Sequence, residues 1–157
     1  MTRKTWSSTA ESRLPTGPSP EAIKRAIHEI WPDADAVETA VAAFFSVDPV
    51  KHWPNFATIV SSDDFDQVSD LSRPGVFRLN IRVGSETFDR LVGSVSEPDF
   101  AALDAVLPHP EYAAQHWVCI LNPSEATFRD VVLPLLGEAH GLLVAQLART
   151  RTGADGA

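Results

Sequence analysis

Arg78, Asn80 and Arg82 are the side chains whose types and spacing best suit a binding surface. They alternate with four apolar residues, Phe77, Leu79, Ile81 and Val83. This alternation is typical of an antiparallel strand with one face in the core, and it places the three polar side chains together on the other face. Together they would span about 13 Å of strand. Two guanidinium groups and an amide can bind an anionic or carbonyl-bearing ligand, whereas the alternative is a solvated face on which the arginines pair with acidic residues.

A second candidate group lies in a short segment that contains His109, Tyr112 and His116. Imidazole is the usual general acid or base near neutral pH, and the three side chains are close enough in sequence to face a common cleft. Pro108 and Pro110 stiffen the loop around His109. The spacing matches no zinc motif, and we predict no metal site. The alternative is a structural role for both histidines.

Other reactive residue types carry weaker signals. Asp63, Asp64, Asp66 and Asp70 form an acidic stretch that lacks the glycine and closing glutamate of a calcium loop, so we expect a solvated loop. Cys119 stands between apolar neighbours with no basic residue beside it, which favours an inert core thiol. The sequence contains no phosphate-binding glycine loop, nucleophile elbow or dinucleotide fingerprint, and we predict no cofactor.

Charge and composition restrict the classes of partner. Between residues 19 and 147 the chain has 8 basic and 19 acidic residues, a net charge of −11. Because phosphate backbones are bound by Lys and Arg, we expect no nucleic-acid binding. A single cysteine excludes an internal disulfide, and no leader is recognisable at the N-terminus, so we expect a cytoplasmic protein. The longest apolar run, near Leu142, is shorter than the roughly 18 residues of a membrane span, and we expect no membrane association.

The chain is long enough for one domain with its own core. Residues 1–18 mix Ser, Thr, Pro and Gly without an apolar period, and we predict a disordered N-terminal arm. Residues 19–148 are predicted to form a single α+β domain. Residues 149–157 are predicted to be a disordered C-terminal tail.

The first half of that domain is predicted to begin with a helix and continue with strands. Ser19 can cap a helix that ends at Trp31, before Pro32. Residues 36–47 suit either a helix or strands, and we favour two short strands. Residues 56–60 are β-branched and aromatic and predict another strand.

The second half is predicted to alternate short helices and strands. Ser85 can cap a helix that stops at Gly93, and residues 100–107 suit a further turn or two of helix. Residues 116–121 read as a buried strand. Asn122 can cap the last helix, with Pro123 at its first position. Its apolar period continues across Pro134, which predicts a kinked helix or two consecutive helices.

This order of elements resembles the YjbR-like (MmcQ/YjbR) families of small bacterial proteins. Within that group, residues 73–81 (RPGVFRLNI) and 117–128 (WVCILNPSEATF) look like a subfamily that is a domain of unknown function. The resemblance implies a CyaY-like (bacterial-frataxin-like) fold, in which helices pack on one side of a twisted antiparallel sheet. It implies no catalytic residue.

Two functional hypotheses follow from these residues. The first is a non-catalytic binding or accessory domain that holds a small molecule or a protein partner on the open side of the sheet, through Arg78, Asn80, Arg82, His109 and His116. The alternative is a small cofactor-free enzyme. In it, His109 or His116 would act as the acid or base, and Arg78 would stabilise developing negative charge.

Overall fold

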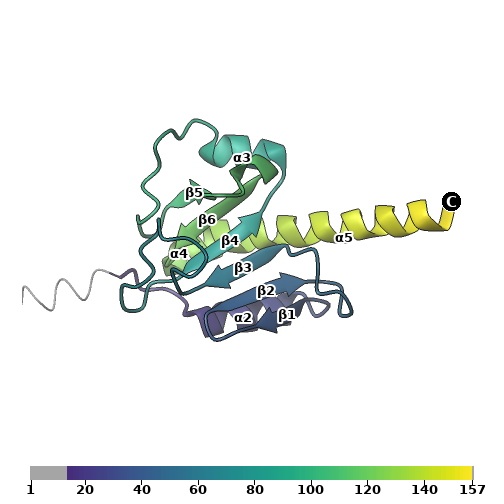
Figure 1. Ribbon diagram of the computed structural model, residues 1–157, viewed down its shortest axis with the longest axis horizontal. Helices are drawn as coiled ribbons and strands as arrows, with labels where there is room; N and C mark the ends of the chain where they lie inside the picture. The colour runs from purple at the N-terminus through teal and green to yellow at the C-terminus, as the bar shows by residue number, and fades with distance from the viewer. Residues whose placement is uncertain (1–13, 157) are drawn as a thin grey trace, which may run out of the picture.

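The computed structural model describes residues 14–156, with side chains as far as residue 150. It is an α+β fold built on a six-stranded antiparallel sheet with the order β1-β2-β3-β4-β6-β5 (Figure 1). The strands are β1 (Asp35–Glu38), β2 (Ala42–Ser46), β3 (Ala57–Val60), β4 (Arg78–Arg82), β5 (Val106–Pro108) and β6 (Trp117–Leu121). The predicted fold class is therefore confirmed, and so are the two strands favoured for residues 36–47.

The two faces of the sheet have different compositions. On one face Ile59, Leu79 and Ile120 lie side by side in register, and all three are buried. On the other face the same strands place Thr58, Asn80 and Cys119 side by side. The alternation in β4 therefore has the predicted orientation, with apolar side chains in the core and polar ones on the opposite face.

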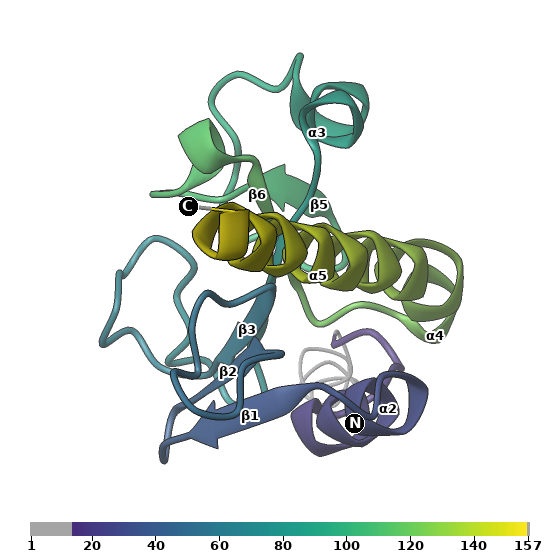
Figure 2. The same cartoon turned by 90° about the vertical axis from the view of Figure 1, so that its right-hand side faces the viewer.

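Helices cover only the apolar face. Helix α2 (Pro20–Ile30) begins at Ser19, whose hydroxyl accepts a hydrogen bond from the backbone N–H of Ala22, as the sequence predicts. It contributes Ile23 and Ile27 to the core. Helix α5 (Leu133–Gly156) crosses the same side, and its last turns extend past the sheet (Figures 1 and 2). Helix α3 (Ser85–Val92) packs near the β5 and β6 edge.

The last helical region is continuous but irregular. A short α-helical turn, α4 (Glu125–Thr127), leads into a π-helical segment, η2 (Phe128–Val132), and then into α5. The backbone N–H of Leu133 bonds to the carbonyl of Phe128, five residues earlier, directly before Pro134. A proline cannot donate the next helical hydrogen bond, so the wider turn accommodates it. The prediction of a kinked helix or two consecutive helices is thus met in part, because the irregular turn precedes Pro134 and α5 itself continues through the proline.

By length and composition alone, the stretch Glu125–Thr150 is apolar enough to cross a membrane. In the fold, however, one face of this stretch is fully buried against the sheet, through Val132, Leu136, Ala139 and Leu143. Core helices of that kind share the composition of membrane spans. The expected absence of membrane association stays a prediction.

Three local predictions are wrong. Ser85 does not cap helix α3, because the helix begins at Ser85 and its N-cap is Gly84, without a side-chain hydrogen bond. Residues 100–107 do not form a helix, because Val106 and Leu107 pair with Ile120 and Cys119 as the edge strand β5. The last helix is capped by Ser124, whose hydroxyl accepts from the N–H of Thr127, and not by Asn122. The Asn122 side chain instead accepts from the N–H of Phe77 and donates to the carbonyl of Gly75.

The ends of the domain differ from the predicted boundaries. The carbonyl of Thr16 accepts a hydrogen bond from the backbone N–H of Glu125 at 3.0 Å. Gly17 lies so close to Pro123 that a side chain at this position would collide with its backbone. Residues 14–18 thus contact the domain, and the remainder of the predicted arm lies outside the described residues. At the other end, α5 continues through most of the predicted tail, to Gly156.

Candidate ligand-binding cavity

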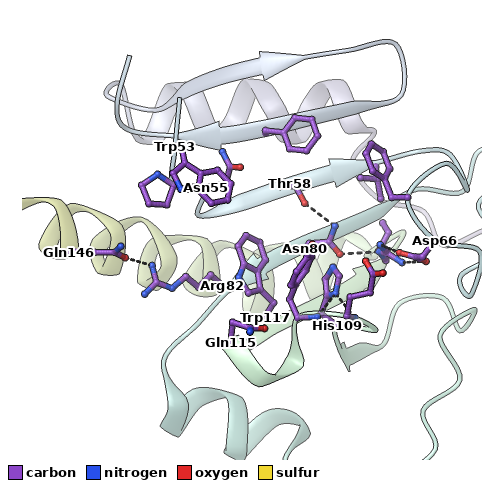
Figure 3. Close-up of a pocket in the computed structure, with 17 residues that line it drawn as sticks. Trp53, Asn55, Thr58, Asp66, Asn80, Arg82, His109, Gln115, Trp117 and Gln146 are labelled. Carbon is purple, nitrogen blue, oxygen red and sulfur yellow. Dashed lines mark hydrogen bonds and ion pairs between the residues drawn. The ribbon is translucent and has the colours of Figure 1, made fainter. Parts of the chain in front are cut away.

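A cavity of about 690 Å³ opens on the sheet face that the helices leave free (Figure 3). Strands β2, β3, β4 and β6 form its floor, and the loops after β2, β3 and β5 form its walls. Its lining comprises Phe44, Trp53, Pro54, Asn55, Thr58, Val60, Phe65, Asp66, Arg78, Asn80, Arg82, His109, Glu111, Tyr112, Gln115, Trp117 and Gln146. Four of the five predicted site residues therefore line one cavity.

Asn80 and Thr58 form the polar centre of the floor. The two residues are register partners on β4 and β3, and the Asn80 amide donates to the Thr58 hydroxyl at 2.9 Å. The Asn80 carbonyl oxygen accepts from Nε of Arg78 at 3.0 Å. These bonds fix the orientation of the amide and of the hydroxyl. The floor therefore presents a preorganised polar strip between apolar walls.

Arg78 is a buried structural residue and not an open binding group. Only 2% of it is exposed. Its guanidinium donates to both carboxylate oxygens of Asp66, at 3.0 and 2.8 Å, and to the hydroxyl of Ser69. These hydrogen bonds lower the pKa of Asp66 and keep it ionised. The ion pair thus attaches the loop of residues 61–75 to the sheet through Asp66, whereas Asp64 and Asp70 of the acidic stretch are exposed to solvent. Arg78 is therefore paired with an acidic residue, which is the alternative stated in the sequence analysis, and is not an available ligand-binding cation.

Arg82, at the other end of β4, has different surroundings. Its side chain is half-buried, and its guanidinium donates to the carboxamide oxygen of Gln146 on α5 at 2.6 Å. Within residues 14–150 no carboxylate lies in ion-pairing distance of it. Most of its five N–H groups therefore remain available.

His109 faces the cavity as a neutral ring. Nδ1 accepts from the backbone N–H groups of Glu111 and Tyr112, at 3.0 and 3.1 Å, which leaves the proton on Nε2. Burial, reinforced by the positive charge of Arg78, lowers the pKa of His109 to about 4. His109 is 5% exposed, and no partner for Nε2 is present in the part of the chain that the structure describes. It can offer one N–H donor, but it is a poor acid or base at neutral pH.

His116 does not belong to the cavity, and this prediction is wrong. The residue ends the 3₁₀ turn of Ala113–Gln115 in the left-handed conformation, with φ of 68°, so it precedes β6 instead of alternating within it. Its ring packs against Phe88 of α3. Cys119 does lie on the open face, but burial raises the pKa of its thiol to about 12, which agrees with the predicted inert thiol.

Aromatic side chains surround the polar floor. Trp53, Tyr112 and Phe65 are 66%, 52% and 47% exposed, and they are the only exposed Phe, Tyr or Trp residues within residues 14–150. All three line this one cavity. Trp117 packs edge-on against His109, and Tyr112 lies over the same ring, with the two ring centres 4.9 Å apart. Three exposed aromatics around one hollow indicate a binding surface, because an apolar patch in water is otherwise unfavourable.

The sequence analysis missed Trp53, Phe65, Trp117 and Gln146. The sequence held a signal for Trp53 and Phe65, since each is a large aromatic residue outside the predicted helices and strands. Such residues rarely lie in a polar loop without a contact to make. The contribution of Gln146 carried no such signal, because it depends on how α5 crosses the sheet. No group of three His, Cys, Asp or Glu residues suited to a metal occurs in the described part of the chain.

Comparisons with known proteins give a family but no function. No curated protein and no solved structure matches the chain. No finding links the chain to the YjbR-like proteins or confirms a frataxin-like fold. Residues 18–152 match a family described as a family of unknown function, DUF6194. Since this match spans most of the chain, the protein belongs to the DUF6194 family.

Proposed function

We propose that the protein is a non-catalytic binding protein, and that its ligand is a small, planar and largely apolar organic molecule held on the open face of the sheet. The observation that carries the proposal is the gathering of every exposed aromatic residue of the described chain around one cavity with a polar floor. The volume of about 690 Å³ lies within the range of small-molecule sites. Flat aromatic walls favour flat ligands, because rings stack with offset faces.

Binding is favoured over catalysis by the state of the polar groups. The enzymatic hypothesis needs His109 or His116 as acid or base and Arg78 as the stabiliser of negative charge. His116 lies outside the cavity, Arg78 is neutralised by Asp66, and His109 holds its proton on Nε2 with a pKa of about 4. A concave site also suits a small molecule better than a protein partner, which usually needs a broader and flatter surface.

We also propose that the protein is distantly related to the YjbR-like proteins. The support for this kinship is the order of elements, in which a helix, an antiparallel sheet and a long final helix follow one another. An experimental structure that superposes on a YjbR-like protein strand by strand, in the order β1-β2-β3-β4-β6-β5, would support the kinship. A different strand order in those proteins would contradict it.

The binding proposal can be tested with a neutral probe, naphthalene-2-carboxamide, by isothermal titration calorimetry. We expect measurable binding, and a loss of about fivefold or more in affinity for Trp53→Ala and for Tyr112→Ala. Ile30→Ala, which removes an exposed apolar side chain of α2 outside the cavity, is the control and should bind as the unaltered protein does. Absence of binding at millimolar probe, or equal affinity in all variants, would contradict the proposal.

A further inference from the structure

The two ends of the cavity differ in charge. Asp66 and Arg78 lie at one end and cancel each other through two hydrogen bonds. Arg82 lies at the other end, bonded to the neutral side chain of Gln146 (Figure 3). Within residues 14–150, Arg25, Lys51 and Arg90 also lack a carboxylate partner, but all three are exposed to solvent. Among the Lys and Arg residues of the described chain that are at least partly buried, Arg82 is the one without a carboxylate partner.

The position of Arg82 relative to the aromatic walls adds a second observation. Arg82 and Trp117 are register partners on β4 and β6. Figure 3 shows Trp53 and Trp117 at the Arg82 end of the cavity, on either side of the space above the strand. A ring lying between these two indoles would place a substituent within reach of the guanidinium. Such a substituent is bound best when it is a planar anion, because a carboxylate matches the fork of N–H donors.

The opposite end of the cavity is unfavourable for an anionic group of a ligand, because acidic side chains lie there. Asp66 remains ionised there, and the exposed Glu111 belongs to the same wall as His109. The neutral imidazole of His109 offers one N–H group, which suits a carbonyl or hydroxyl oxygen of a ligand. The cavity therefore accommodates one anionic group at Arg82 and an uncharged group near His109.

We propose that the cavity selects aromatic monocarboxylates, with the carboxylate on Arg82 and the ring between Trp53 and Trp117. This inference rests on the proposed function and adds the ligand class and the orientation of the ligand. An ion pair between the guanidinium and a carboxylate is stronger than the hydrogen bond from the same guanidinium to a neutral amide oxygen. The carboxylate should thus bind more tightly than the isosteric amide, and the preference should depend on Arg82 alone.

The test compares naphthalene-2-carboxylate with naphthalene-2-carboxamide by calorimetry at pH 7. We expect the unaltered protein to bind the carboxylate about tenfold or more tightly than the amide. Arg82→Gln should abolish this preference, because it should weaken binding of the carboxylate far more than binding of the amide. Arg90→Gln, which alters an exposed arginine of α3 outside the cavity, should leave the preference intact. Higher salt should reduce the preference, since screening weakens a partly exposed ion pair.

The outcomes separate the two proposals. If both probes bind equally, or if Arg82→Gln keeps the preference, the ligand class is overturned while the binding function stands. If 2-naphthyl phosphate binds more tightly than the carboxylate, the anion is of the wrong class and the inference is likewise overturned. If neither naphthalene probe binds, the proposed function itself fails, and the inference fails with it.

Discussion

Arg78 and Arg82 stand on the same strand and the same face, four residues apart, but they have opposite surroundings. The guanidinium of Arg78 is buried and bonded to a carboxylate, a hydroxyl and an amide. The guanidinium of Arg82 is half-buried and bonded to a single carboxamide. The pattern along β4 makes the two residues equivalent, so the difference originates in the segments that cover them.

The covering segments are a loop at one end and a helix at the other. The loop of residues 61–75 brings Asp66 and Ser69 onto Arg78 and closes that end of the cavity. Helix α5 brings only Gln146 to Arg82. A buried charge must be compensated, whereas a charge at the edge of a cavity can retain its solvent or take a ligand. The same residue type therefore has a structural role at one end, and at the other end it is the group that we propose for ligand recognition.

The largest expected effect is on stability, from Arg78→Ala. This change removes four hydrogen bonds and leaves Asp66 without its cation, so it should lower the free energy of unfolding by about 3 to 5 kcal/mol. Urea unfolding measures the loss. The double variant Arg78→Met/Asp66→Leu should recover part of it, because no uncompensated charge stays buried. A loss below about 1 kcal/mol for Arg78→Ala would show that Arg78 stabilises the fold no more than Arg82 does, and would contradict the structural role assigned to Arg78.

A smaller effect depends on pH, through His109. The pKa of this residue is about 4 in the fold, against an ordinary value of 6.5, so between these pH values the unfolded chain binds a proton that the fold excludes. The free energy of unfolding should therefore decrease by about 2 kcal/mol from this residue as pH falls from 7 to 5. The loss should be complete below pH 4.

The variant His109→Asn isolates this contribution, because an amide oxygen can still accept the N–H groups of Glu111 and Tyr112 but does not titrate in this range. Its unfolding free energy should change less than that of the unaltered protein between pH 7 and 5. Parallel curves for the two proteins would show that His109 is accessible to protons in the fold. The Arg78 end of the cavity would then be less closed than its contacts indicate.

Arg82→Ala should have a small effect on stability, in contrast to Arg78→Ala. It removes one hydrogen bond to a neutral group and breaks no ion pair within the described residues, so we expect a change of about 1 kcal/mol or less. Thermal unfolding followed by circular dichroism measures it. A loss as large as that of Arg78→Ala would show that Arg82 is also a structural residue, and the ligand would have to be bound by other groups.

The smallest expected effect is binding of nucleic acid, which we expect to be absent. Since Arg78 is neutralised and residues 19–147 carry a net charge of −11, the single uncompensated guanidinium of the cavity cannot hold a phosphate backbone. We expect no shift of duplex DNA or RNA in a gel at physiological salt. Submicromolar, salt-sensitive binding by the unaltered protein, lost in Arg82→Gln, would instead identify the open face as a nucleic-acid surface.

Features that depend on local sequence could be predicted, but those set by distant contacts could not. The alternation of β4 and the Ser19 cap follow from neighbouring residues, and both are confirmed. Strand β5 has three residues and forms only because β6 is beside it, so its own sequence suggested a helix. The burial of Arg78 likewise depends on Asp66, 12 residues earlier, and on the path of the loop between them. The position of His116 does not follow from strand alternation, because His116 itself adopts the left-handed conformation and ends a 3₁₀ turn before β6 begins.

Within residues 14–150, Gln146 is the one residue through which α5, the helix that covers the opposite face of the sheet, lines the cavity, and its side chain accepts the hydrogen bond from Arg82. Most N–H groups of Arg82 are available to a ligand, but a ligand that binds Nη1 must share this bond or displace it. Its binding would then change an interaction that stabilises the position of α5. Thermodynamic linkage is reciprocal: if ligand binding changes the equilibrium between the bonded and unbonded positions of α5 by some factor, a contact that shifts α5 between them changes the ligand affinity by that factor. Gln146 lies ten residues before the end of that helix, whose last turns extend past the sheet. If a ligand alters this bond, the projecting turns of α5 are where the change would be detected.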